Sequence, residues 1–178
     1  LLSQAEHDEN AQSILITDSD NVVKAVTEQV DIILKNLSRA EIAGKSWKHN
    51  GAVIKVPDLD TAAELSNRIA PEHLELCVSN PEDLAKKIFN AGAIFLGHWT
   101  PEAVGDYVTG PNHVLPTSRS ARFSSGLSVM EFLKRTTLAK VSRGALLKIG
   151  PSAVTLANSE GLECHGRSIN ERMKSNSE

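Results

Sequence analysis

Residues 51–96 read GAVIKVPDLDTAAELSNRIAPEHLELCVSNPEDLAKKIFNAGAIFL, in which short apolar runs alternate with longer amphipathic segments. The apolar runs are typical of β-strands, and the segments between them are typical of helices. The runs lie at 51–56, 74–78 and 93–96. Because strands and helices alternate with short connections, we expect βαβ units that build a parallel sheet.

The segments between the runs begin with residues that favour helix N-termini. Asp58 can cap the first helix, and Thr61 with Glu64 supplies capping-box chemistry. Asn80 can cap the second helix, with Pro81 in the first turn, where its missing N–H costs nothing. We expect these helices to end at Ile69 and at about Asn90.

The same alternation extends towards the N-terminus. Residues 13–17 (SILIT) form another β-rich run, and Ser19 or Asp20 can cap the helix that follows. The apolar face of that helix comprises Val22, Val26, Val30, Ile33 and Leu37. The first eight residues also look helical. The predicted fold class is therefore α/β, an incomplete Rossmann-like parallel sheet flanked by helices over residues 11 to about 97.

The chain changes character after this region. Residues 101–126 are rich in Gly, Pro, Ser and Thr, which predicts a long ordered loop, and such loops are often functional. After Ser128 the pattern is helical. We therefore expect an α/β part over residues 1–126, carrying most of the site, and a small all-helical tail over residues 127–178. The tail has too little apolar mass for its own core, so it should pack against the α/β part or another subunit.

The composition argues against several classes of partner. The 178 residues are 40% hydrophobic and 23% charged, as in soluble globular proteins. The net charge is only −3, without a long basic run, so neither nucleic acid nor an anionic membrane is expected as the main partner. No apolar stretch approaches the ~20 residues of a membrane helix, and no signal peptide is visible. We expect a cytoplasmic protein, and the start at Leu1 inside a candidate motif suggests a piece of a longer polypeptide.

The two cysteines, Cys77 and Cys164, lie outside any CxxC motif. Two free thiols in a reducing cytosol are favoured over one disulfide. Cys77 falls in an apolar run and is expected in the core. Cys164 adjoins His165, but nothing in its setting requires a role in chemistry.

Four of the six histidines stand near acidic or amide residues in segments that are far apart in the sequence. The pairs are Gln4–His7, Glu72–His73, Asp106–His113 and Glu160–His165. Each pair also has a plain structural interpretation as a solvated helix face, a surface loop, a turn or a helix end. The pair after Pro71 is the strongest, because a carboxylate beside an imidazole is a ready acid–base couple.

Considered together, the pairs predict one metal and acid–base site assembled from distant segments. A mixed set of oxygen and nitrogen donors comes from Gln4, His7, Asp106 and His165. Such a set suits zinc or a similar divalent cation, and the absence of cysteine from it disfavours a purely structural zinc. Glu72 and His73 are then left for proton transfer. Of the remaining histidines, His49 is expected to be exposed and His98 to pack structurally.

Five motifs are long and distinctive enough to indicate a family. They are LLSQAEHD (1–8), NRIAPEHLEL (67–76), GAIFLGHWTPEAVGDYVTGPNHVLPT (92–117), FSSGLSV (123–129) and SEGLECHGRSI (159–169). Through them the chain resembles the C-terminal portion of the histidinol dehydrogenases over essentially all of its length. The resemblance implies an NAD-dependent zinc enzyme that oxidises L-histidinol to L-histidine through L-histidinal, in two hydride transfers, as the last step of histidine biosynthesis.

The resemblance also implies roles for particular residues. Glu72 and His73 would be the catalytic acid–base residues, and His113 would have a smaller role near the site. The implied zinc ligands are Gln4, His7, Asp106 and His165. The implied substrate contacts are Gln4, His7, His73, Asp106, Glu160 and His165.

The family further implies one zinc per subunit and a homodimer with shared active sites. The helical tail would reach into the partner, where Glu160 and His165 would complete its site. The residues that bind NAD are expected in the N-terminal nucleotide-binding part, which is absent from this chain, so the fragment alone should have little activity.

Two other functions stay open at the level of sequence. One is a zinc-dependent hydrolase with Glu72 as the base, and the other is a non-catalytic, metal-stabilised dimerisation module. The hydrolase is disfavoured because four protein ligands leave little room for a nucleophilic water and because no HExxH motif is present.

Overall fold

A computed structural model describes residues 1–174 of the chain. The chain divides into two compact units, Leu1–Phe132 and Leu133–Glu178, and each is considered by itself. The predicted α/β class is confirmed, because helices and parallel strands make up the first unit and helices make up the second. The functional roles expected for the two parts stay predictions.

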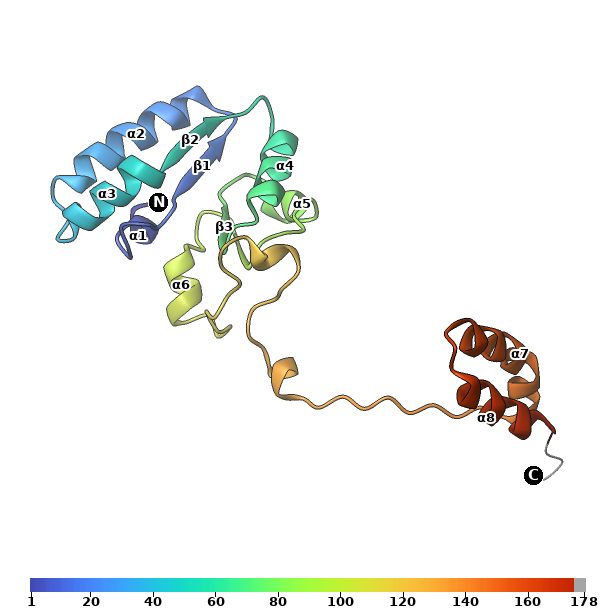
Figure 1. Ribbon diagram of the computed structural model, residues 1–178. Helices are drawn as coiled ribbons and strands as arrows, with labels where there is room; N and C mark the ends of the chain where they lie inside the picture. The colour runs from blue at the N-terminus through green and yellow to red at the C-terminus, as the bar shows by residue number, and fades with distance from the viewer. Residues whose placement is uncertain (175–178) are drawn as a thin grey trace. The chain divides into compact units, whose positions relative to one another are not determined.

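The first strand pair comes from the N-terminal third of the chain. It comprises β1 (Ile14–Thr17) and β2 (Ala52–Lys55), connected through α2 (Asp20–Leu34) and α3 (Ala40–Asn50). The strands are parallel, and α2 packs alongside both of them (Figure 1). α2 begins as predicted, with the Ser19 hydroxyl accepting a hydrogen bond from the N–H of Val22 at 3.4 Å.

The sequence pattern does not predict α3, and the buried face of this helix explains why. Its buried residues are Ala43 and Ser46, both 0% exposed, rather than large apolar side chains. The Ser46 hydroxyl donates a hydrogen bond to the carbonyl of Ala11 at 2.8 Å. A helix that packs through small residues has no strong apolar stripe for a periodicity search to detect. His49, in the last turn of α3, is exposed as expected.

The second strand pair follows directly. It comprises β3 (His73–Leu76) and β4 (Ala93–Leu96), preceded by α4 (Leu59–Ile69) and connected by α5 (Pro81–Ala85). These strands are also parallel, so the expected sheet is present as two separate two-stranded pairs. α4 begins as predicted, with Asp58 accepting a hydrogen bond from the N–H of Thr61 at 2.7 Å. A buried hydrophobic cluster of Ala63, Leu76, Leu84 and Ile88 lies under this pair.

α5 ends at Ala85 rather than near Asn90, and one side chain accounts for the difference. Asn67 accepts hydrogen bonds from the backbone N–H groups of Phe89 and Asn90, at 2.7 and 3.1 Å. Its amide also donates to the carbonyl of Lys87 at 2.8 Å. These bonds satisfy backbone groups that a longer helix would pair internally, so the helix stops early.

The stretch 101–126 is not the continuous loop that its composition predicts. It contains α6 (Glu102–Tyr107) and a short 3-10 helix at Ser120–Arg122. α6 lies directly against β4, because a Cβ placed on Gly105 would overlap the ring of Phe95. The glycine that suggests a turn in the sequence therefore permits a close helix–strand contact instead.

The second unit contains α7 (Arg143–Ser159) and α8 (Glu163–Lys174). Ser142 caps α7 by accepting a hydrogen bond from the N–H of Ala145 at 3.2 Å. The helices approach closely, because a Cβ on Gly150 would come within 2.5 Å of the sulfur of Met173. Residues 133–142 contain no helix, which corrects the expectation of helical structure throughout the tail. Charged and polar residues interrupt the apolar pattern there.

Little apolar surface is buried within the second unit. Only small residues of α7 and α8 are buried, namely Gly150, Ala157 and Gly166. Among the described residues of this unit, seven larger apolar side chains are exposed, namely Leu133, Leu138, Val141, Leu147, Ile149, Leu156 and Leu162. This is the pattern that a low apolar mass produces. No helix among residues 1–174 is both long and apolar enough to cross a membrane.

Candidate active site

The junction of α4 and β3 positions Glu72 and His73. α4 ends at Ala70, which adopts a left-handed φ of 53°, and Pro71 then leads into β3. The carbonyl of Glu72 accepts a backbone hydrogen bond of 2.9 Å from the first residue of β4. A Cβ on Gly92 would come within 2.6 Å of that carbonyl, so glycine is needed for the strands to pair this closely.

α6 places two carboxylates opposite His73. Glu102 and Asp106 are four residues apart on this helix and therefore share one face. The Nε2 atom of His73 lies 4.0 Å from Oε1 of Glu102 and 3.9 Å from Oδ1 of Asp106. The side chains of His73, Glu102 and Asp106 are only 16, 12 and 16% exposed, so water screens their interaction less than that of a surface ion pair. Their donor atoms lie within 4.8 Å of one another, close enough to hold a metal ion.

A backbone contact ties the start of α6 to β3. The N–H of Glu102 donates a hydrogen bond to Oε1 of Glu75 at 2.7 Å. Glu75 is two residues after His73 in the strand, so both side chains leave β3 on the same side. One strand therefore carries the imidazole and also anchors the helix that faces it.

The Nε2 atom of His73 is buried and has no hydrogen-bond partner among the described residues. The two carboxylates attract it electrostatically but are too distant for hydrogen bonds. The ring also contacts Phe95, with the ring centroids 6.1 Å apart. An unpaired buried nitrogen costs about 1–3 kcal/mol, so this atom is well suited to accept or donate a hydrogen bond to a bound molecule.

The same surroundings affect Glu102. Burial raises the pKa of its carboxyl group, and a hydrogen bond with Asp106 raises this pKa further. The attraction of His73 acts in the opposite direction.

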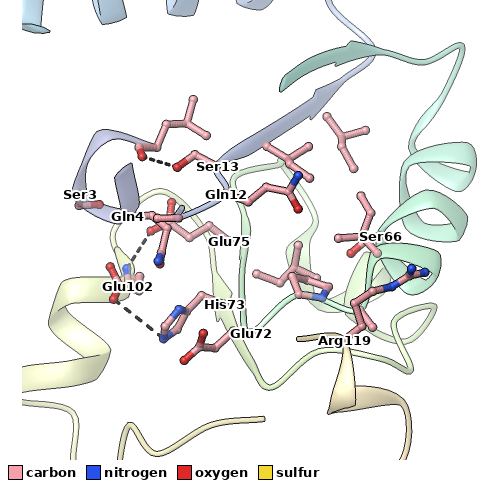
Figure 2. A pocket seen from close by; sticks show the side chains of 18 of the residues that line it. Ser3, Gln4, Gln12, Ser13, Ser66, Glu72, His73, Glu75, Glu102 and Arg119 are labelled. Carbon is pink, nitrogen blue, oxygen red and sulfur yellow. Dashed lines mark hydrogen bonds and ion pairs between the residues drawn. The ribbon is translucent and has the colours of Figure 1, made fainter. Parts of the chain in front are cut away.

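These groups border a cavity of about 540 Å³. Figure 2 shows Gln4, Glu72, His73 and Glu102 around it, with Gln4 coming from α1 (Leu2–Ala5). Three residues predicted from distant segments, Gln4, Glu72 and His73, therefore line one cavity. Asp106 adjoins the cavity through its contact with His73.

His7 lies outside the helix expected for the first eight residues. α1 ends at Ala5, and the side chain of Asp8 then accepts a hydrogen bond of 2.8 Å from the N–H of Asn10, which stabilises a turn. His7 is exposed. The charge of His7 still reaches the site, because it slightly lowers the pKa of Glu102 and is the smallest of the effects on that group.

Asp106 also faces a second histidine. Nδ1 of His113 lies 3.7 Å from Oδ2 of Asp106, while the other oxygen faces His73. His113 is 61% exposed, so this contact is well solvated. The structure places Asp106 in α6 rather than in the turn that its neighbour Gly105 suggests.

Glu160 and His165 belong to the second unit. Glu160 is the C-terminal cap of α7, His165 lies in the first turn of α8, and both are exposed. The metal-binding and substrate-binding roles implied for these residues stay predictions.

Two expectations outside the site are wrong. His98 does not pack structurally but is exposed, because Gly97, with φ of 81°, turns the chain away at the end of β4. Cys77 is exposed rather than part of the core, since the preceding Leu76 takes the buried side of the strand. Both cysteines are free, as expected.

Glu102 is a site residue that sequence patterns did not predict. The available signal was its spacing of four residues from Asp106 in the segment PEAVGDY. The glycine and proline content favoured a loop, in which that spacing has no meaning. Only the helical geometry of α6 brings both carboxylates to His73.

The fold and the cavity together define a class of protein. An imidazole, carboxylates and an amide converge on one cavity beside the N-terminal end of β3. This is the expected arrangement of an enzyme site that combines acid–base residues with potential metal ligands. A family model of histidinol dehydrogenase matches residues 1–173, and the chain belongs to the histidinol dehydrogenase family.

Individual relatives agree with this membership. The histidinol dehydrogenases of Ruegeria pomeroyi and Cereibacter sphaeroides are 67% and 64% identical over 173 residues, covering 97% of this chain and 40% of each relative. The crystal structure of histidinol dehydrogenase from Elizabethkingia anophelis matches with a TM-score of 0.89 at 38% identity. That match covers 99% of this chain and 41% of the solved chain. The chain thus spans about 40% of the length of the relatives it matches.

Proposed function

We propose that this chain carries acid–base and metal-binding groups of an NAD-dependent, zinc-dependent histidinol dehydrogenase. The reaction would be the oxidation of L-histidinol to L-histidine through L-histidinal, in two hydride transfers, as the last step of histidine biosynthesis. Family membership supports the substrate and the reaction. The observation that most supports a role in chemistry is the unpartnered Nε2 of His73, which lies near Asp106 on the same cavity as Glu72.

The donor groups around the cavity are compatible with a zinc ion. Gln4 lines the cavity and Asp106 adjoins it through His73, and both offer oxygen atoms. The imidazole nitrogen of His7 is assigned to the set by the family resemblance. His165 of the partner subunit would complete the set in the proposed homodimer. When bound, the zinc would hold the imidazole and amine of the substrate and so orient its alcohol group.

His73 suits the role of general base in the first oxidation. As the substrate C–H bond breaks, its electron pair leaves with the hydrogen as hydride to NAD⁺, and the hydroxyl O–H proton must go elsewhere. Nε2 of His73 is free to accept that proton because it has no partner in the protein. The nearby carboxylates of Glu102 and Asp106 stabilise the positive charge that the ring then carries.

Glu72 suits the hydration step between the two oxidations. Water adds to the aldehyde carbon of L-histidinal, and Glu72 accepts the water proton as the new C–O bond forms. The carbonyl π bond breaks at the same time, and its oxygen takes the proton that His73 accepted in the first oxidation, which leaves His73 neutral again. The resulting hydrate loses a second hydride to NAD⁺ and a hydroxyl proton to His73, which gives the carboxylic acid. Because Glu72 and His73 line the same cavity, the aldehyde can remain bound between the steps.

The proposal extends to the whole enzyme. The contacts to NAD⁺ are assigned to residues outside this chain, and Glu160 is assigned to substrate binding across the dimer. A cytoplasmic location is part of the same proposal. We call the polypeptide that combines this chain with the additional length of its relatives the complete protein.

An assay of the complete protein tests the proposed function. L-Histidinol and NAD⁺ are supplied, and the absorbance of reduced nicotinamide is followed together with the formation of L-histidine. We expect two NADH per L-histidinol consumed, loss of activity on chelation and recovery with zinc. Zinc-loaded protein that reduces no NAD⁺ at saturating L-histidinol would refute the proposal, and hydrolytic activity instead would favour the zinc-hydrolase alternative.

A further inference from the structure

Glu102 is outside the proposed ligand set and neither donates nor accepts a proton in the steps described above, although its position is unusual for an acidic residue. Its side chain is 12% exposed and faces the imidazole of His73 from the first residue of α6 (Figure 2). Acidic residues are seldom buried this far without a specific interaction. A role in the site is therefore a better explanation than a solvated helix surface.

The backbone around Glu102 is anchored to the strand that carries His73. The N–H of Glu102 donates to Glu75 at 2.7 Å, and Glu75 shares a face of β3 with His73. The absence of a side chain on Gly105 lets α6 rest against Phe95, whose ring in turn contacts His73. The imidazole thus contacts an aromatic ring and faces a carboxylate, and both of these groups are anchored to the same strand pair.

Asp106 is poorly placed to orient His73 alone. One of its oxygens lies 3.7 Å from Nδ1 of His113, and the same carboxylate is a proposed ligand of the metal ion. A carboxylate that neutralises a metal has less negative charge available for a neighbouring ring. Glu102 lies 4.0 Å from Nε2 and is not assigned to the metal ion. Among the described residues it also contacts Asp106.

We propose that Glu102 is a positioning residue that holds the imidazole of His73 so that Nε2 faces the substrate in the cavity. This inference rests on the proposed function. The distance of 4.0 Å makes this an electrostatic contact and not a hydrogen bond, so Nε2 remains available for the substrate proton. Glu102 acts through His73 and does not itself need to touch the substrate.

The test compares three variants in the zinc-loaded complete protein. Glu102→Ala removes the carboxylate, Glu102→Gln keeps its shape and one oxygen, and Glu28→Gln is a matched control on the exposed side of α2. For Glu102→Ala we expect kcat to fall about 10- to 100-fold, as for other residues that orient active-site groups, with unchanged zinc content. KM for L-histidinol should change less than about threefold, because the interaction matters for proton transfer rather than for binding. Glu102→Gln should recover part of the loss, and Glu28→Gln should show none.

A second measurement does not depend on turnover. In protein labelled with ¹⁵N-histidine, the ring signals of His73, assigned through His73→Asn, should shift or broaden in Glu102→Ala but not in Glu28→Gln. If the unsubstituted protein reduces no NAD⁺, the proposed function fails, whereas these signals still test the positioning role. If Glu102→Ala does not fold, the kinetics and the ring signals are both measured on Glu102→Gln.

Three results would overturn the inference. Unchanged kcat and ring signals in both Glu102 variants would show that His73 is oriented without this carboxylate. Loss of zinc in parallel with activity would make Glu102 a metal ligand, as its proximity to His73 and Asp106 allows. A rise in KM with kcat unchanged would assign it to substrate binding.

Discussion

His73 carries most of the proposed chemistry, and its surroundings are unusual for a structural histidine. A histidine that only fills space in a core normally has both ring nitrogens paired with protein groups or water. Here Nε2 is buried without a partner, while two carboxylates lie within 4.0 Å of it. Such an arrangement leaves the nitrogen free to accept a proton from a bound molecule.

Replacement of His73 by asparagine separates its catalytic role from metal binding. In His73→Asn we expect kcat to fall about 10²- to 10⁴-fold, the typical contribution of a general base. Zinc content should remain that of the unsubstituted protein, because His73 is outside the proposed ligand set. Steady-state kinetics and metal analysis of the complete protein measure both quantities. Loss of zinc from this variant would move His73 into the ligand set.

The carboxyl group of Glu102 predicts an effect of pH on stability. Its pKa in the folded protein is raised above the ordinary 4.5, so its contribution to stability is full below that value and is lost as pH rises through the folded-state pKa. Glutamine does not titrate. In urea unfolding of chelated protein, Glu102→Gln should therefore gain stability relative to the unsubstituted protein as pH rises from 4.5 towards neutrality. A difference that stays constant or reverses over this range would contradict the assignment.

At the scale of the elements, α6 is the part of the fold on which the site most depends. It carries Glu102 and Asp106, and its position requires Gly105 to lie against Phe95. Its six residues are too few for a stable isolated helix, so contacts with β3 and β4 must hold it in place.

Substitution of Gly105 tests this dependence. Gly105→Ala should lower the free energy of unfolding by about 1–3 kcal/mol, because the added methyl group overlaps Phe95, and kcat should fall as α6 moves away from His73. Gly44→Ala in α3 is the matched control, since a Cβ there meets nothing within 4 Å. The control should gain about 0.5–1 kcal/mol from the better helix propensity of alanine. Equal stability and activity in both variants would contradict the close contact.

The elements that could be predicted from sequence are those with strong local signals. The four strands stand out as apolar runs, and the N-termini of α2 and α4 stand out through Ser19 and Asp58. The errors have a different origin. α3 packs through small residues, and Asn67 accepts hydrogen bonds from backbone groups beyond α5. Both features depend on tertiary contacts, which no local sequence pattern contains.

At the scale of the whole molecule, the candidate site draws on segments spread across the chain. The convergence of Gln4, Glu72 and His73 on one cavity could be predicted from their chemistry as donor and acid–base groups. Its location at the start of β3 could not, because ligands of parallel sheets usually lie beyond the carboxyl ends of the strands. The role of Glu102 could not be predicted, because its position depends on the helix α6, whereas the glycine and proline content of that segment indicates a loop. Glu160 and His165 lie in the second unit, and the proposed dimer would bring them to a site of the partner subunit.

Mixed dimers test the sharing of active sites between subunits. His165→Ala and Glu72→Gln should each abolish most activity in homodimers of the complete protein. In a heterodimer of the two variants, one site would combine an intact Glu72 with an intact His165 of the partner subunit. Co-expression with two affinity tags should therefore recover up to about one active site in two. Purified heterodimers without activity would show that the two residues serve the same chain's site.

Anomalous X-ray scattering at the zinc edge, from crystals of the complete protein with L-histidinol, is the most direct test of this site. We predict one ion per subunit, about 2.0–2.2 Å from atoms of Gln4, His7, Asp106 and His165 of the partner subunit. The alcohol oxygen of L-histidinol should lie within hydrogen-bonding distance of Nε2 of His73. An ion bound directly by His73 and Glu102, or substrate bound away from β3, would contradict both the ligand set and the role of His73 as base.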